Sequence, residues 1–190
     1  DVEVIYTTWA FIDSTTNHNR VISVILILLT IPLVGLGTFL AYSGAHAQKG
    51  GSIFVATLSG FNEVPSVASN GFGFAIVTIS EDEKSITFEL TYYDLANVSM
   101  AHIHFGRDGH VGGVAVWLCG GPKPACPTSY GKVTGTRTAS DVVALPAQGL
   151  NAGDFDQLIK AIRAGAAYVN VHTAKFPAGE IRGQLVPITG

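Results

Sequence analysis

The stretch of sequence that decides the fold is Ala101-His102-Ile103-His104-Phe105, read together with Tyr168-Val169-Asn170-Val171-His172-Thr173. Side chains of an extended strand alternate between its two faces. The first stretch therefore places both histidines on one face and its apolar residues on the other. The second stretch places Tyr168, Asn170 and His172 together. The pattern predicts two strands, each with an apolar face and a face that carries imidazoles, and three histidines meet if these strands are neighbours.

Such a cluster of histidines on strands predicts a metal site. Imidazoles at positions i and i+2 of one strand can both reach one ion, and a third from a neighbouring strand completes a set for copper or zinc. The candidate ligands are His102, His104 and His172, with His110 in the following loop as a further candidate. The alternative is that these imidazoles hydrogen-bond loop backbone and fix one end of the domain. The sequence leaves both interpretations open.

The rest of the domain reads as short strands separated by turn residues. Apolar residues alternate over 72–79 and again over 86–92, with a polar turn between them, which predicts a hairpin. Further strands are expected over 53–58, 114–118, 130–138 and 179–187. One helix is predicted by the i, i+3, i+4, i+7 spacing of Phe155, Leu158, Ile159 and Ile162, and we expect it to pack across an open end or face of a barrel.

Together these patterns predict an all-β fold over residues 53–187: an antiparallel Greek-key or immunoglobulin-like sandwich or barrel with one short helix. Before it, residues 21–42 contain no charged residue. A helix over them would span roughly 33 Å, enough to cross a bilayer core. Residues 1–20 receive no structural assignment, and residues 43–52 are expected to be a linker.

The apolar segment is either a transmembrane anchor or the apolar region of a signal peptide. Arg20 precedes it, and Ala45-His46-Ala47 follows it as an A-x-A cleavage site before Gln48. The membrane is therefore an expected partner, through an N-terminal helix. We expect the domain at the cell membrane facing outward, or secreted if cleavage follows Ala47.

Cysteine use agrees with export. Cys119 and Cys126 are the only cysteines in the chain's 190 residues, and a segment rich in Gly and Pro separates them. In an oxidising compartment this spacing predicts a short disulfide loop. Zinc binding is the alternative, although C-x6-C is wider than the usual C-x2–4-C. The net charge of −3 and the lack of Lys/Arg clusters argue against nucleic acid as a partner.

Catalytic motifs are not apparent. The sequence shows no Ser-His-Asp or Cys-His set with suitable spacing and no nucleotide-binding motif, which favours a protein that is not an enzyme. On the last strand Glu180, Arg182 and Gln184 share a face. This spacing predicts a structural ion pair between Glu180 and Arg182 at the rim of the barrel. The alternative is that Arg182 steers an anion toward a metal.

The chain resembles the CHRD domain, the module named after chordin. The motifs that carry the resemblance cover roughly residues 53–186; they are Phe54–Leu58 with Asn62-Glu63-Val64-Pro65, Ala101–His104, Ile162–Gly165, Tyr168–Thr173 and Pro177–Gln184. The resemblance implies an all-β domain outside the cell or anchored to its membrane, without a settled activity. It favours an extracytoplasmic binding or structural module whose partner is an extracellular protein or polymer.

A second resemblance is to copper/zinc superoxide dismutase, in which an H-x-H strand and a later histidine also occur in a β-barrel. It implies that His102, His104 and His172 hold copper and that Arg182 attracts superoxide. The chain has no clear bridging histidine and no second cluster of zinc ligands. The alternative function is therefore a copper-binding redox protein, with or without dismutase activity.

Overall fold

The structure, a computed structural model, describes residues 52–188. The segment 21–42, expected to be an anchor or signal, lies outside the described residues. Within 52–188, no helix is long and apolar enough to cross a membrane.

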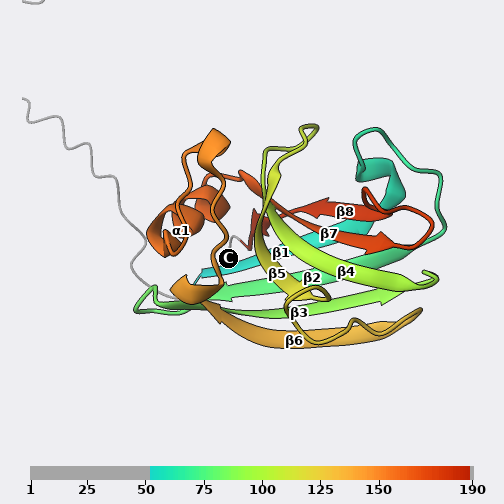
Figure 1. Cartoon of the computed structure of the whole chain (residues 1–190), viewed down its shortest axis with the longest axis horizontal. Coiled ribbons are helices and arrows are strands. Elements are labelled where there is room, and N and C mark those ends of the chain that lie inside the picture. Colours follow the sequence, from blue (N-terminus) through green and yellow to red (C-terminus); the bar gives the residue numbers. More distant parts are fainter. Residues whose placement is uncertain (1–51, 189–190) are drawn as a thin grey trace, which may run out of the picture. The chain divides into compact units, whose positions relative to one another are not determined.

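Nine strands and one α-helix make up the described part of the chain (Figure 1). The strands are β1 (Ser52–Ser59), β2 (Phe72–Ile79), β3 (Ser85–Tyr93), β4 (Val98–Phe105), β5 (Gly113–Cys119), β6 (Gly131–Thr138), β7 (Ala167–Thr173), β8 (Ile181–Gln184) and β9 (Val186–Pro187). The helix α1 spans Phe155–Arg163, and short 3-10 turns lie at Gly60–Asn62, Ala139–Asp141 and Pro146–Gln148.

The strand expected over 179–187 is interrupted. Leu185 lies between β8 and β9 and is fully buried. β8 pairs with β7 and with Ser59 at one end of β1, whereas β9 pairs with Phe54 and Val55 near the other end of β1. The chain therefore turns at Leu185 because this side chain enters the core and the remaining residues pair with β1.

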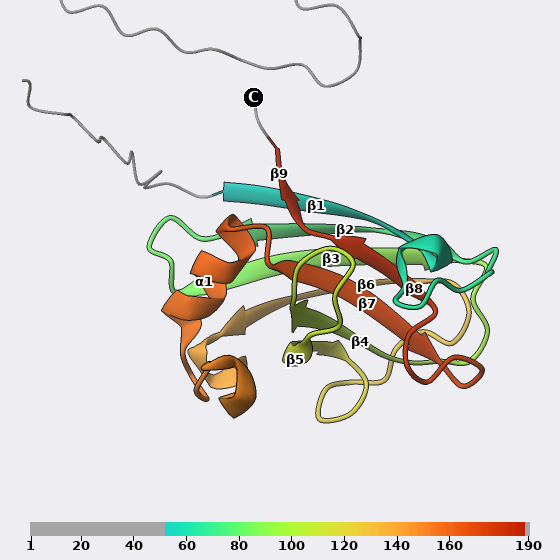
Figure 2. The same cartoon turned by 90° about the horizontal axis from the view of Figure 1, so that it is seen from above.

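All strands belong to one antiparallel sheet, in the order β5-β4-β7-β8-β1-β2-β3-β6 with β9 beside β1 (Figure 2). The predicted hairpin is confirmed, since β2 and β3 pair from Phe72↔Tyr93 to Ile79↔Ile86. The sheet curls into a nearly closed barrel. Across the seam, Arg137 of β6 donates from Nε to the carbonyl of Trp117 and from Nη2 to that of Leu118, both at 2.7 Å.

The interior of the barrel is apolar. Ile103 of β4, Val169 and Val171 of β7 and Ile181 of β8 are fully buried in one core cluster. The apolar face of α1 joins that cluster, and the helix covers one end of the barrel, as the spacing predicted (Figure 2). Because successive side chains alternate, the polar residues of β4, β7 and β8 lie on the outer face of the sheet.

Candidate metal centre

The outer face of β4, β7 and β8 carries a continuous polar layer. Strand pairing sets His102 opposite Asn170 and His104 opposite Tyr168, while Asn170 is in turn opposite Arg182. Residues directly opposite each other in an antiparallel pair project to the same side. The prediction that the two histidine-bearing stretches form neighbouring strands is therefore confirmed.

This polar layer is buried beneath loops. His102 is 2% exposed, His104 7% and His172 6%. Arg182 Nη2 donates to the carbonyls of Arg107 and His110, at 2.9 and 2.8 Å, and so holds the loop of residues 106–112 over the sheet. The polar side chains thus face loop backbone rather than solvent.

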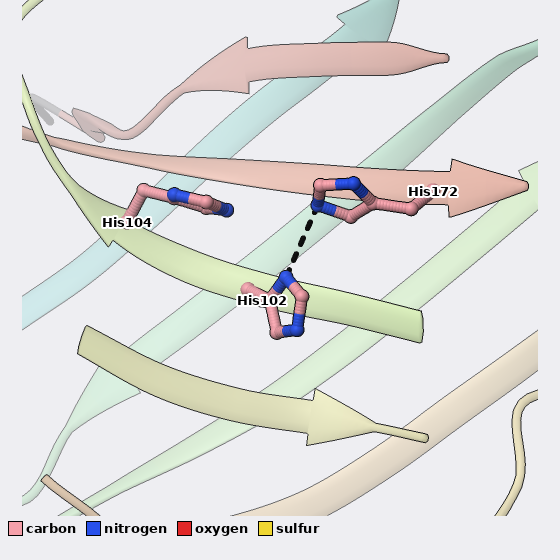
Figure 3. A group of neighbouring side chains, drawn as sticks. All are labelled: His102, His104 and His172. Atoms are coloured by element: carbon pink, nitrogen blue, oxygen red, sulfur yellow. Dashed lines mark hydrogen bonds between the residues drawn. The ribbon is translucent and has the colours of Figure 1, made fainter. Parts of the chain in front are cut away.

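Three imidazoles converge within this layer (Figure 3). One ring nitrogen from each of His102, His104 and His172 lies within 4.8 Å of the other two. The closest pair is His102 Nδ1 and His172 Nε2, at 3.1 Å. The ligand set predicted from two distant stretches of sequence is therefore brought together by β4 and β7.

Loop carbonyls fix the tautomers of two of these rings. His104 Nδ1 lies 3.0 Å from the carbonyl oxygen of Gly112, and His172 Nδ1 lies 3.0 Å from that of Pro177. In a neutral imidazole only one nitrogen is protonated, and the nitrogen that faces a carbonyl is the donor. The Nε2 atoms of His104 and His172 are consequently the ones with a free lone pair. His172 Nε2 accepts a hydrogen bond from His102 Nδ1.

Two buried nitrogens have no hydrogen-bond partner within residues 52–188. They are His102 Nε2 and His104 Nε2. An unsatisfied buried polar atom costs roughly 1–3 kcal/mol and calls for an explanation. In Figure 3, one nitrogen of His104 faces the other two rings. A ligand shared by the three rings would satisfy His104 Nε2. His102 would face such a ligand with Nδ1, so its proton would move to Nε2 and its hydrogen bond to His172 would be lost.

Burial keeps the three rings neutral. Desolvation, together with the neighbouring imidazoles, lowers the pKa of His102 to about 3. Desolvation likewise lowers the pKa of His104 to about 4, against the opposing effect of the Gly112 carbonyl. The pKa of His172 is also lowered by burial. The rings are therefore neutral at neutral pH, which is the charge state in which imidazole binds metal ions.

The donor set fits a first-row transition metal. Neutral imidazoles are ligands that both zinc and copper accept. Nitrogens bound at 2.0–2.1 Å cannot be more than about 4.2 Å apart, so the 4.8 Å cluster would have to contract by at least about 0.6 Å. The carbonyls at the Nδ1 atoms of His104 and His172 are the outer-shell acceptors that metal-binding histidines commonly have.

Aromatic rings flank the cluster on both sides. The ring of Tyr168 stacks on His104, with centroids 4.8 Å apart and planes within 7°. Trp117 lies at 89° to His102, with centroids 4.2 Å apart. These contacts restrict the rotation of the two imidazoles.

The expected ion pair at the rim of the barrel is not formed. Glu180 instead accepts hydrogen bonds from Ser69 Oγ at 2.7 Å and Thr173 Oγ1 at 2.6 Å. Arg182 is only 2% exposed, and its guanidinium lies 3.5 Å from the centroid of Tyr168. The prediction failed because Ser69 and Thr173 bond Glu180, while carbonyls of the 106–112 loop bond Arg182 and bury it.

Glu63 is a charged group of this layer that the sequence did not single out as a site residue. It is 7% exposed, and its Oε2 lies 3.4 Å from Asn170 Nδ2. Burial raises the pKa of Glu63 to about 7, although the charge of Arg182 and the Asn170 hydrogen bond act in the opposite direction. Its place in the Asn62-Glu63-Val64-Pro65 motif was the only signal, because nothing in a loop sequence indicates that the loop folds over a sheet.

The remaining candidates lie apart from the three rings. His110 is exposed in the 106–112 loop, with its Nδ1 2.9 Å from the carbonyl of Asp108, and is not a member of the cluster. Gln184 donates to the carbonyls of Gly106 and Gly165. Cys119 and Cys126 form the predicted disulfide, with Cα atoms 5.2 Å apart.

Comparison with known proteins gives one result. A family model described as the CHRD domain matches residues 54–185, which is more than half of the chain. Neither the curated proteins nor the solved structures include a match to this chain.

Proposed function

The chain belongs to the CHRD domain family, and from that premise we propose that it is an extracytoplasmic binding module, anchored to the membrane or secreted, whose ligand is a single copper ion. His102, His104 and His172 would hold the ion. A bound copper ion would supply one-electron redox chemistry at a buried position.

One observation carries this proposal: the convergence of three neutral imidazoles from two rigid strands, with ligand atoms within 4.8 Å. Two features support a ligand rather than a purely structural cluster. His104 Nε2 is buried without a partner within the described residues, and it faces the other two rings. Two of the rings also have their other nitrogen fixed by a loop carbonyl, which is the arrangement that orients a metal ligand.

The outer position of the domain is supported by the disulfide between Cys119 and Cys126. Such bonds persist in oxidising compartments and are rare in the cytosol. The uncharged segment 21–42 supports a route across or into the membrane.

A second candidate role is a structural lock, in which the imidazoles only hold the loops. The hydrogen bonds of His104 to Gly112 and of His172 to Pro177 favour it. It gives no partner to the buried Nε2 of His104, however. A dismutase activity is less well supported than copper binding, because Arg182 lies beneath the 106–112 loop and donates to its carbonyls instead of facing solvent.

Copper binding is tested with the purified full chain in detergent. Electron paramagnetic resonance during a Cu(II) titration should give one signal per chain, with hyperfine splitting from nitrogen ligands. The fluorescence of Trp117 should fall in parallel, because its ring contacts His102; a Trp9→Phe background leaves Trp117 as the only tryptophan.

Two variants distinguish copper bound by the three histidines from copper bound elsewhere on the chain. His102→Ala should lose the signal, because it removes one of three ligands. His110→Ala is the matched control, since it removes an exposed histidine outside the cluster, and it should bind copper like the parent chain. If the parent chain takes up no copper at micromolar concentrations, or if His102→Ala binds as well as His110→Ala, the three-histidine proposal is wrong and the structural lock stands.

A further inference from the structure

A second surface of the barrel is apolar and uncovered. It lies on the outer face of β9, β1, β2 and β3. Its large apolar residues are between 40% and 57% exposed: Ile53, Phe72, Phe74, Ile76, Val186 and Ile188. We call this set, with the half-buried Val55 and Tyr93, the apolar face.

Strand pairing shows that the apolar face is continuous. Val55 is paired with Ile76 on one side and with Val186 on the other. Phe72 is paired with Tyr93, and the two rings stack with centroids 4.9 Å apart. Phe74 meets Phe72 edge to face at 6.2 Å. These contacts join strands β9 to β3 in a single strip.

The remaining outward residues of this strip carry little charge. Thr57 and Thr91 flank Phe74 across the sheet. The strip's one ion-paired charge within residues 52–188 is Glu89 of β3, which lies opposite Ile76 and pairs with Lys132 of the neighbouring strand β6. Contiguous exposed apolar surface of this kind marks a site of interaction with a protein or a membrane.

The sequence before the domain favours a membrane over a protein as the partner of the apolar face. Ile53, the first residue of the apolar face, is the second residue of β1, and ten residues separate it from the uncharged segment 21–42. Ten residues span at most about 35 Å when fully extended. If segment 21–42 is anchored in a bilayer, the start of the domain stays within about 35 Å of the membrane surface, and the apolar face begins where the tether ends.

We propose that the apolar face rests on the lipid bilayer that holds the anchor. Phe and Tyr side chains favour the boundary between headgroups and acyl chains, where an apolar ring meets a polar surface. This inference rests on the anchored form of the proposed function. In the order of the sheet, β4 and β7 lie across the barrel from β2 and β3 (Figure 2). The three-histidine layer and its loops would then face away from the membrane.

The test uses the full chain reconstituted into vesicles that contain brominated phosphatidylcholine, a quencher confined to the lipid. Because the native cysteines form a disulfide, one introduced cysteine can be labelled with a small fluorophore. Thr57→Cys places the label within the apolar face. Val111→Cys is the matched control, since Val111 is 74% exposed on the loop over the histidine layer.

We expect quenching at least twofold stronger for the label at position 57 than for the label at position 111. Combining Thr57→Cys with Phe72→Ser, Phe74→Ser and Ile76→Ser should abolish that difference. Equal quenching at both positions overturns the inference, as does binding of the apolar face to a polysaccharide or to a second copy without quenching.

Flotation of the vesicles distinguishes a failure of this inference from a failure of the anchored form of the proposed function. A chain that floats with the vesicles but shows no selective quenching is anchored without resting on its apolar face, so only this inference fails. A chain that does not float is not anchored, and the anchored form of the proposed function fails with it. Copper titration of the Phe72→Ser, Phe74→Ser and Ile76→Ser variant, which leaves the histidine layer unchanged, should match the parent chain in both cases.

Discussion

Surface side chains are usually polar when exposed and apolar when buried, and the two outer faces of this barrel show the reverse. On β4, β7 and β8, charged and polar side chains such as His102, Asn170 and Arg182 are almost completely buried. On β1 and β2, Phe74 and Ile76 are half exposed. Both faces belong to the same sheet, and both lie outside the same apolar core.

The difference teaches that loops, rather than side-chain polarity, decide burial here. Three loops, 60–71, 106–112 and 174–180, cross the polar face and are held there by hydrogen bonds from it: Asn170 to Glu63, Arg182 to His110 and His172 to Pro177. A polar layer can bury loop backbone because it supplies the donors and acceptors that such backbone requires. The apolar face offers no such partners, and the described chain leaves it open.

The largest expected effect comes from breaking the link between Arg182 and its loop. Arg182→Met removes two hydrogen bonds to the 106–112 loop and leaves the Glu63 carboxylate without its neighbouring positive charge. We expect a loss of about 3–5 kcal/mol in the free energy of unfolding at pH 8. Denaturant titration followed by Trp117 fluorescence measures it.

The matched control for that change is Arg107→Met, whose side chain is exposed in the same loop. It should change stability by less than about 0.5 kcal/mol. Equal effects of the two substitutions would show that the polar face does not hold the loop.

A smaller effect is expected from crowding the same layer at Gly179. A Cβ there would lie 2.7 Å from the amide of Asn170 and from Glu63 Oε1, and its φ of +132° disfavours L residues. Gly179→Ala should therefore destabilise the domain by about 2–3 kcal/mol. Gly109→Ala is the control, because Gly109 also has a positive φ (+71°) but has no atom within 4 Å of the Cβ position. Thermal melts that show the same loss for both would mean that the layer is not tightly packed.

Lowering the pH should reduce the free energy of unfolding of the metal-free domain, because its buried histidines resist protonation. The pKa values of His102 and His104 are about 3 and 4 in the folded state, below the ordinary value of 6.5. The unfolded chain therefore binds more protons below pH 6.5, and stability falls as pH is lowered from there. The loss reaches about 2 kcal/mol per imidazole at pH 5.

Glu63, in contrast, stabilises the folded state as the pH falls over the same range. Its folded pKa of about 7 lies above the ordinary 4.5, so the folded state takes up a proton as pH falls and gains stability. Glu63→Gln should consequently make the acid loss steeper. Denaturant titrations from pH 7 to pH 5 with a chelator present test this, and a Glu63→Gln profile parallel to that of the parent chain would contradict it.

The smallest effect is expected on the apolar face. Phe74→Thr removes a half-exposed ring that contacts Phe72, and should cost less than about 1 kcal/mol. Phe88→Thr, in the neighbouring strand but facing the core at 5% exposure, should cost about 3–5 kcal/mol. If both changes cost the same, the apolar face is a structural part of the barrel rather than a surface kept for a partner.

Much of the fold and of the candidate site was predictable from local patterns. Alternation identified the strands, including the β2–β3 hairpin, and apolar spacing identified α1. The same alternation placed His102, His104 and His172 on polar faces. The break at Leu185 was not predictable, because the alternation continues through it and only the pairing of β9 with β1 requires the turn.

The sequence by itself determined which side chains share a face of each strand, since that depends only on the period of two in an extended chain. Only the tertiary structure decided that β4 and β7 are neighbours, that loops bury Arg182 and Glu63, and that Glu180 bonds Thr173 instead of Arg182. These features depend on contacts between residues far apart in the chain, and a local pattern contains no information about which distant segment will supply the hydrogen-bond partner.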